Sequence, residues 1–104
     1  MRTTVTCRHG EISDDLRARA VDVLERFGQL SPHALEGTAL FDTEPAGFRV
    51  ELRLHVRRGH ILVSEAEAAD PRTALDRAEE KIKRQLERAV AAVRGPSRPS
   101  GDLS

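Results

Sequence analysis

The stretch FRVELRLHV, residues 48–56, decides the fold because it alternates between apolar and polar residues along its whole length. Apolar side chains occupy every second position, at Phe48, Val50, Leu52, Leu54 and Val56. The positions between them carry Arg49, Glu51, Arg53 and His55. A period of two indicates a β-strand with one buried face and one solvated face. A sheet built from such strands needs helices on its buried face only.

The sequence on either side of this strand predicts three more. Downstream, RRG (residues 57–59) closes a short hairpin into HILVSEAEA (residues 60–68). Upstream, ALEGTALFD (residues 34–42) predicts a strand that the turn TEPAG (residues 43–47) joins to the central one. At the N-terminus, RTTVTCR (residues 2–8) alternates and is rich in β-branched residues, which is typical of a strand.

Two helices complete the predicted elements. The first follows Ser13, which is a good N-cap before two acidic residues, and its apolar residues recur at helical spacing. We expect it to end at Gly28 as a C-cap, or after a fraying turn at Leu30. The second is capped by Asp70, has proline at its first position and runs to about Arg94.

The predicted order is therefore β-α-β-β-β-α, and the expected fold class is α/β, more strictly α+β. We expect a two-layer sandwich, with one four-stranded, mostly antiparallel sheet, two helices on one face and the other face open. The 104 residues are enough for one domain, which we place at residues 1–94. The remaining GPSRPSGDLS, residues 95–104, is predicted to be a disordered tail.

Charge is balanced overall but unevenly distributed. The chain has 17 basic and 17 acidic residues, and its net charge of zero argues against a general nucleic-acid binder. Residues 71–104 nevertheless carry eight bases and five acids. There are three Phe, no Trp and no Tyr, so any contact with RNA would use phosphates and shape instead of base stacking. The N-terminus has no apolar signal core and no apolar run approaches a membrane span, which predicts a soluble, cytoplasmic protein.

The last helix sorts its charges by face. Its predicted core positions are Leu75, Ala78, Ile82, Leu86, Ala89 and Val93. A second line of residues, the basic stripe, consists of Arg77, Lys81, Arg84 and Arg88. A third sector carries Asp76, Glu79, Glu80 and Glu87, with Lys83 among them. Two interpretations stay open: a solvated face with Glu79–Lys83 and Glu80–Arg84 pairs, or a ridge that contacts phosphates.

A second candidate surface is the open face of the sheet, where Arg2, Arg8, Arg49, Arg53 and His55 take outward positions. Basic residues there also keep strands soluble. No chemistry of another kind is indicated. Cys7 points inward, and the four histidines, His9, His33, His55 and His60, lack metal-ligand spacing. We therefore predict no catalytic residues, no metal and no cofactor.

With these elements placed, the chain resembles the ribosome hibernation-promoting factors, also called ribosome-associated inhibitor A, protein Y or sigma-54 modulation proteins. Four segments carry the resemblance: VTCRHGEISDDLR (5–17), EPAGFRVELRLHV (44–56), GHILVSEAEAAD (59–70) and ALDRAEEKIKRQLER (74–88). It implies a fold like a double-stranded-RNA-binding domain with an added strand. It also implies a non-catalytic factor that occupies the mRNA and tRNA channel of the small ribosomal subunit and inhibits translation during stress or stationary phase.

By position, the family's contacts with ribosomal RNA map to Arg8, Lys81, Arg84 and Arg88, and Arg77 joins them only through the basic stripe. The chain departs from the family in three respects: a nearly uncharged continuation after the last helix's basic residues, Pro71-Arg72 in place of a Met-Tyr pair, and a neutral net charge. The long form of the family carries a C-terminal dimerising domain, where this chain has only a short tail, so the resemblance is to the short form. A monomer is expected, with no membrane and no small-molecule substrate. The alternatives are a diverged protein-interaction module that keeps the fold, and a general binder of double-stranded RNA.

Overall fold

The computed structural model describes residues 1–31 and 33–94, and the tail predicted at residues 95–104 lies outside the described residues. The elements are β1 (Arg2–Arg8), α1 (Asp14–Leu30), β2 (Ala34–Glu44), β3 (Gly47–Val56), the 3-10 turn η1 (Arg57–Gly59), β4 (Ile61–Ala68) and α2 (Pro71–Arg94). The predicted β-α-β-β-β-α order is confirmed.

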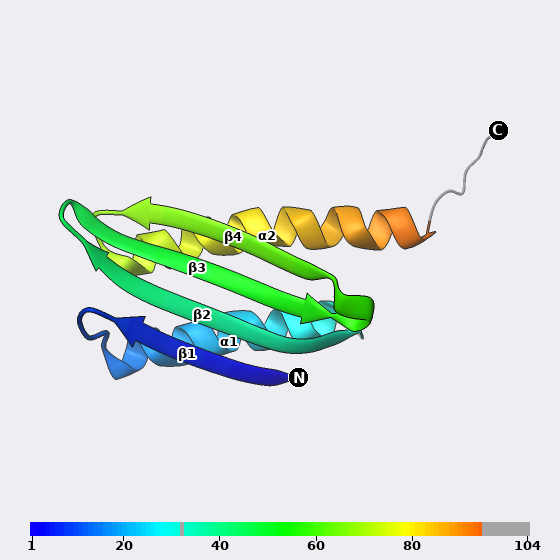
Figure 1. Cartoon of the computed structure of the whole chain (residues 1–104), viewed down its shortest axis with the longest axis horizontal. Helices are drawn as coiled ribbons and strands as arrows, with labels where there is room; N and C mark the ends of the chain where they lie inside the picture. Colours follow the sequence, from blue (N-terminus) through cyan, green and yellow to red (C-terminus); the bar gives the residue numbers. More distant parts are fainter. Residues whose placement is uncertain (32, 95–104) are drawn as a thin grey trace.

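One four-stranded sheet, in the order β1-β2-β3-β4, forms one layer of the molecule. β1 runs parallel to β2, whereas β2–β3 and β3–β4 are antiparallel pairs. α1 packs against β1 and β2, and α2 packs against β3 and β4. Figure 1 shows both helices behind the sheet and the other sheet face uncovered. The predicted two-layer sandwich is confirmed, and β1 and β4 are its two edge strands.

The core lies between the sheet and the helices. From β3, the alternating residues Val50, Leu52 and Leu54 are fully buried, as the period of two predicts. α1 contributes Leu16, Ala20, Val23, Leu24 and Phe27, and α2 contributes Ala74, Leu75, Ala78, Ile82 and Leu86. The side chains at the other two predicted core positions, Ala89 and Val93, lie outside the described part of the chain. Each helix therefore buries one apolar stripe and leaves its charged faces to solvent.

The start of α1 is as predicted, and of its two predicted ends the later one, at Leu30, is confirmed, so Gly28 is not the C-cap. The Ser13 hydroxyl accepts a hydrogen bond from the Leu16 N–H at 3.1 Å, which is the expected N-cap. The helix continues to Leu30, and the Ser31 N–H donates to the Phe27 carbonyl oxygen. At Gly28, an added Cβ would lie 3.1 Å from a Met1 side-chain carbon. This glycine therefore allows close approach of the N-terminus instead of ending the helix.

The β2–β3 hairpin is tighter than predicted, because β2 extends to Glu44 and β3 begins at Gly47. Only Pro45 and Ala46 remain as the turn. Gly47 has φ 153°, and a Cβ there would collide with the Ala68 carbonyl oxygen of β4. The backbone conformation and the close neighbouring strand together require glycine at this position.

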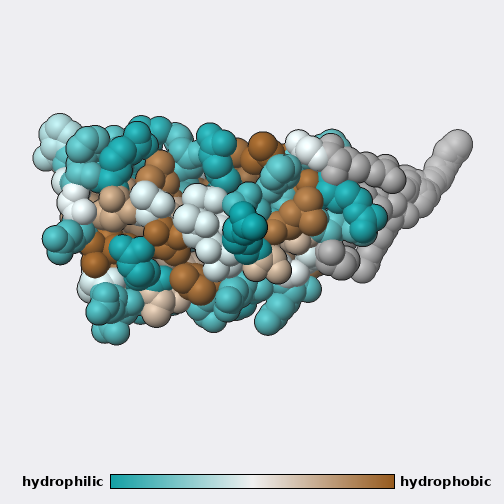
Figure 2. Space-filling model, turned by 60° about the horizontal axis from the view of Figure 1, so that its bottom comes forward, coloured by the Kyte–Doolittle hydropathy of each residue, from teal (hydrophilic) through white to brown (hydrophobic). Residues whose placement is uncertain are grey.

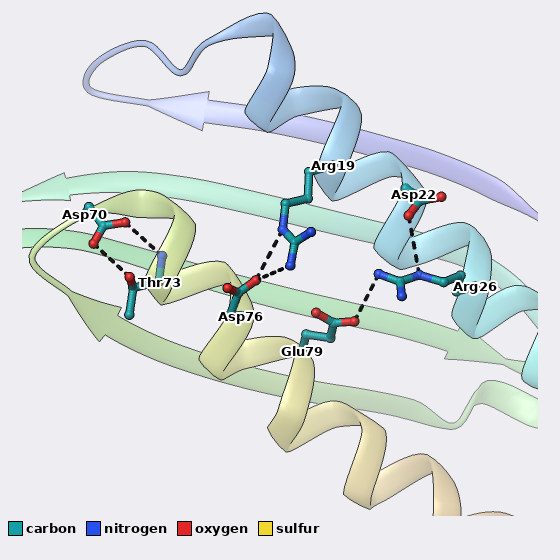
Figure 3. Close-up of polar contacts among 7 residues, drawn as sticks. All are labelled: Arg19, Asp22, Arg26, Asp70, Thr73, Asp76 and Glu79. Carbon is teal, nitrogen blue, oxygen red and sulfur yellow. Dashed lines mark hydrogen bonds and ion pairs between the residues drawn. The ribbon is translucent and has the colours of Figure 1, made fainter.

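The start of α2 is held by Asp70, as predicted. Its carboxylate accepts hydrogen bonds from the Thr73 N–H at 3.0 Å and from the Thr73 hydroxyl at 2.8 Å (Figure 3). These two bonds, the backbone one first, hold the pKa of Asp70 below its ordinary value. The cap fixes where α2 begins and so determines which of its residues face β4.

Candidate nucleic-acid interface

The basic stripe of α2 lies along the outer edge of β4, and part of it is bonded to that strand. Alternate carbonyl oxygens of an edge strand point away from the sheet and have no partner strand. Side chains of α2 donate hydrogen bonds to three successive carbonyls of this kind. The contacts are Arg77 Nη1 to Glu67 (2.9 Å), Lys81 Nζ to Glu65 (2.7 Å) and Gln85 Nε2 to Val63 (2.7 Å).

The match between helix and strand follows from their geometries. Four residues of an α-helix rise about 6 Å, and two residues of a strand rise about 6.6 Å. A donor at every fourth position of α2 therefore meets an acceptor at every second position of β4, with the two elements running in opposite directions. The spacing of Arg77 and Lys81 thus has a structural role that the sequence interpretations did not include. Gln85, the third donor, continues the same spacing. It was not predicted as part of the stripe because only charged residues were assigned to it.

The other two members of the stripe differ from the first two. Arg84 and Arg88 are exposed, and no hydrogen bond or ion pair with another described residue involves their side chains. The basic stripe therefore has two halves: an anchored pair, Arg77 and Lys81, and an unanchored pair, Arg84 and Arg88. All four side chains remain exposed, so anchoring fixes the first pair without burying it.

Two carboxylates of the acidic sector of α2, Asp76 and Glu79, face α1 and are paired there. Asp76 accepts from Arg19 Nη2 at 2.6 Å, and this hydrogen bond raises the pKa of the Arg19 guanidinium. The Glu79 carboxylate accepts a hydrogen bond from Arg26 Nη2 at 3.2 Å, and Arg26 Nε also lies 3.4 Å from Asp22 Oδ2 (Figure 3). Asp76 and Glu79 are thus neutralised, whereas Glu80 and Glu87, the other two acids of the sector, are exposed and form no ion pair with another described residue.

This arrangement corrects the predicted pairing within α2. The Glu79 carboxylate pairs with Arg26 instead of with Lys83, because the side of α2 that carries Glu79 faces α1. For the described side chains of Glu80 and Arg84, no ion pair is formed. The interpretation of α2 as a solvated face held by intrahelical pairs is therefore not what the structure has.

The open sheet face carries both signs of charge. Cross-strand neighbours share a face, so the register places Arg2, Arg8, Arg49 and Arg53 among the carboxylates Glu36, Asp42, Glu44, Glu51, Glu65 and Glu67. Arg49 contacts Glu65 at 2.6 Å and Glu44 at 3.7 Å, and Arg53 pairs with Glu51. These contacts raise the pKa of both arginines, through Glu65 and Glu51 respectively.

The bases of this face were predicted as a candidate surface, but the acids between them were not. His55 lies across from Glu36 on β2 and Ile61 on β4. Apolar side chains also reach solvent here, since Ile61 and Val63 are exposed. Figure 2, in which the β1 side comes forward, shows polar and apolar residues interspersed on that part of the surface. The contact role expected for Arg2, Arg49, Arg53 and His55 stays a prediction, and their surroundings are less basic than the sequence analysis supposed.

Arg8 and the basic stripe do not share a surface. Arg8 ends β1 at one edge of the sheet, whereas the stripe borders β4 at the other edge. Three inter-strand spacings separate the two edges, about 14 Å. Arg8 instead lies beside His9 and Asp42, at 3.8 Å from the Asp42 carboxylate. The sequence analysis gave no role to His9 or Asp42, because β1 and β2 become neighbours only in the folded sheet.

A basic side chain also covers the β1 edge. Arg17, in the first turns of α1, donates from Nη1 to the Val5 carbonyl oxygen at 2.9 Å. Both edges of the sheet are thus contacted by cationic side chains from the helices. Edge strands that are covered in this way are poor templates for pairing with other chains.

Features of other chemistries are sparse in the described residues. Cys7 is half-buried and points toward the core. Within residues 1–31 and 33–94, no three His, Cys, Asp or Glu side chains are grouped as a metal site would need. In that same part of the chain, no helix is long and apolar enough to cross a membrane.

Comparison with known proteins gives one family and several similar structures. The sequence matches the family described as "Sigma 54 modulation protein / S30EA ribosomal protein" over residues 3–94. No curated protein matches the chain significantly. Among solved structures, the chain is similar to the N-terminal domain of Protein Y from Thermus thermophilus, with a TM-score of 0.74 and 24% identity over 86% of this chain and 99% of that one. It is also similar to a ribosomal subunit interface protein from Coxiella burnetii, with a TM-score of 0.77 and 20% identity over 86% and 98% of the two chains.

Proposed function

The chain belongs to the Sigma 54 modulation protein / S30EA ribosomal protein family, and on this premise we propose that it is a non-catalytic ribosome-binding factor. Its partner is the small ribosomal subunit, where it occupies the channel for mRNA and tRNA and inhibits translation during stress or stationary phase. A cytoplasmic location follows from that partner. The contact is made to phosphates of ribosomal RNA, because the chain has few aromatic residues for base stacking.

The observation that carries this proposal is the exposed basic stripe along the β4 edge. From Arg77 to Arg88 the helix rises about 16 Å, which is long enough to follow several phosphates of one RNA strand. Hydrogen bonds to the β4 carbonyls restrain the Arg77 and Lys81 side chains, so these cations lose less side-chain freedom when they bind. The acids on the α1 side of α2 are already paired with Arg19 and Arg26.

Occupation of a channel is supported by the separation of the basic groups. Arg8 and the basic stripe lie at opposite edges of the sheet. The walls of a channel contact a small domain on several sides, so both basic groups can contact RNA there at the same time. Local contacts of this kind also suit a chain whose net charge is zero, since its overall field gives little long-range attraction to RNA.

The test is co-sedimentation of the purified protein with isolated small ribosomal subunits over a series of salt concentrations. We expect pelleting at low salt that falls steeply as salt rises. The triple variant Lys81→Glu, Arg84→Glu, Arg88→Glu should fail to pellet while keeping its circular dichroism spectrum, because none of these residues belongs to the core. If the triple variant pellets to the same extent as the wild type, the role of the basic stripe in ribosome binding is refuted. A plain RNA duplex in excess should not compete, as it would for a general binder of double-stranded RNA.

A second candidate function is a protein-interaction module, and one observation favours it. Ile61 and Val63 on the open face of β4 are 49% and 38% exposed, among charges that are mostly paired with one another. An apolar contact there would persist at high salt, whereas binding to phosphates would be lost. Failure to pellet with small subunits even at low salt would favour this function over the first.

A further inference from the structure

The turn that follows β1 has an uncommon backbone. His9 has φ 59°, in the left-handed region that few non-glycine residues adopt, and Gly10 has φ 146°. A Cβ on Gly10 would lie 2.6 Å from the Thr43 hydroxyl of β2. The chain is thus bent tightly against the end of β2, and no other side chain fits at Gly10 without displacing Thr43. Uncommon backbone conformations of this kind cost free energy and tend to be retained at functional sites.

Asp42 is hydrogen-bonded to His9 of the turn and forms a longer ion pair with Arg8, the last residue of β1. Its Oδ1 lies 3.1 Å from His9 Nδ1, and its Oδ2 lies 3.8 Å from Arg8 Nε. The hydrogen bond from His9 is the main cause that lowers the pKa of the Asp42 carboxyl, and the positive charge of Arg8 lowers it further. The Asp42 side chain is 23% exposed, against 56% for Arg8 and 74% for His9. The carboxylate therefore lies beneath the two basic groups.

The ionised carboxylate also determines how the imidazole ring is oriented. An ionised carboxylate only accepts hydrogen bonds, so the His9 Nδ1 that contacts it must carry the proton. In neutral histidine this leaves Nε2 as an acceptor, directed away from Asp42. An acceptor cannot bond a phosphate oxygen, but it can take the hydrogen of a ribose 2′-hydroxyl, which distinguishes RNA from DNA.

From this geometry we infer that residues 8–10 form a contact with an RNA backbone in which Arg8 binds a phosphate and His9 Nε2 accepts a hydrogen bond from a ribose 2′-hydroxyl. Asp42 is the positioning residue for both. The inference rests on the proposed function, and it adds two residues, His9 and Asp42, to those that the sequence analysis singled out. It also gives a physical reason why a carboxylate belongs next to a phosphate contact.

The first test measures affinity for isolated small ribosomal subunits over a salt series. His9→Asn keeps a residue that tolerates the left-handed conformation but removes Nε2, and it should weaken binding about threefold to tenfold, as for one lost hydrogen bond. The dependence of affinity on salt should stay unchanged, since no phosphate contact is lost. In Arg8→Ala the salt slope should fall by about 0.7 to 0.9, the value for one phosphate. A reduced slope in His9→Asn would overturn the hydroxyl contact.

Asp42→Ala separates a positioning role from a bystander. A carboxylate that merely lay near the RNA would repel phosphates, so its removal would strengthen binding. We expect the opposite, a loss at least as large as that of His9→Asn. In an Arg8→Ala, His9→Asn background the same substitution should no longer weaken binding, because there is nothing left to position. Matched controls are His60→Ala, an exposed histidine outside the turn, and Glu51→Gln, a paired carboxylate elsewhere on the open face.

The tautomer of His9 provides a readout that needs no ribosome. Long-range 1H–15N spectra of the free protein should show a proton on Nδ1 in the wild type and lose that signature in Asp42→Ala, while the melting temperature reports on the fold. An Nε2–H tautomer in the wild type would overturn the inference. If the wild type pellets with small subunits and the His9→Asn and Asp42→Ala variants bind with the same affinity, the inference is overturned but the proposed function is not. Wild-type protein that never pellets would overturn the proposed function, and the inference would fall with it.

Discussion

Two double variants of the basic stripe should separate RNA binding from protection of the sheet edge. Arg84→Ala, Arg88→Ala removes the unanchored pair, and Arg77→Ala, Lys81→Ala removes the pair that donates to the β4 carbonyls. Each variant removes two positive charges from the same face of one helix. Their electrostatic effects on ribosome binding should therefore match, and their effects on the fold should not.

The binding effect can be worked from the number of phosphate contacts. Each lost contact lowers the slope of log affinity against log salt by about 0.7 to 0.9. Two lost contacts reduce it by about 1.5, so affinity should change about eightfold less between 50 and 200 mM salt than it does for the wild type. This reduction applies equally to both variants.

The stability effect concerns the anchored pair alone. In Arg77→Ala, Lys81→Ala the carbonyls of Glu67 and Glu65 lose their donors. Each hydrogen bond at this solvent-exposed edge contributes about 0.5 kcal/mol, at the low end for such bonds. The free energy of unfolding should fall by about 1 kcal/mol, or about 5 °C in melting temperature for a domain of this size. The Arg84→Ala, Arg88→Ala variant should have the melting temperature of the wild type.

The assay pairs salt-dependent co-sedimentation with urea unfolding and light scattering on the same preparations. The Arg77→Ala, Lys81→Ala variant should also scatter more light at high protein concentration, because uncovered edge carbonyls favour pairing between chains. Equal stability of the two variants would refute the role given to the β4 contacts. An unchanged salt slope in the Arg84→Ala, Arg88→Ala variant would refute their role as phosphate contacts.

Three further outcomes follow from the fold. Ser13→Ala should lower the free energy of unfolding by about 1 kcal/mol in a urea titration, because the Leu16 N–H loses its cap; no change would mean that water replaces the hydroxyl. Leu75→Ala should cost about 2 to 5 kcal/mol in the same measurement, since Leu75 is fully buried, and a smaller loss would indicate that the core collapses around the cavity. The pKa of Asp70 is below its ordinary value of 3.8 in the folded protein, so its contribution to stability is present above that value and is lost as pH falls through the lowered pKa. Asp70→Asn should therefore flatten the acid limb of a melting-temperature profile, and an unchanged limb would contradict the assignment of the cap.

Most of the fold could be predicted from the sequence, because local signals and hydrophobic periodicity agreed. The alternation in β3 and the caps at Ser13 and Asp70 were sufficient to place the elements. The prediction of Gly28 as a C-cap of α1 was wrong because this glycine packs against Met1, which approaches it only in the folded chain. A glycine near the end of a helical pattern is ambiguous between a C-cap and a site of close packing.

The candidate site was less predictable, because its properties depend on strand order. Periodicity grouped Arg77, Lys81, Arg84 and Arg88 correctly on one line of α2. Periodicity within α2 carries no information about the backbone carbonyls of β4. The division into anchored and unanchored pairs therefore could not be predicted. The placement of Asp42 beside Arg8 likewise requires β1 to lie next to β2 in parallel register.

The β4 contacts of Arg77 and Lys81 have a consequence for how related chains should diverge, if the basic stripe binds RNA as proposed. In a lineage that no longer met ribosomes, selection on RNA contacts would end, and Arg84 and Arg88 would be free to drift. Selection against misassembly would continue, because loss of Arg77 or Lys81 exposes β4. Basic residues at these two positions are thus weak markers of RNA binding in a relative. The informative positions are Arg84 and Arg88, whose side chains form no hydrogen bond or ion pair with another described residue.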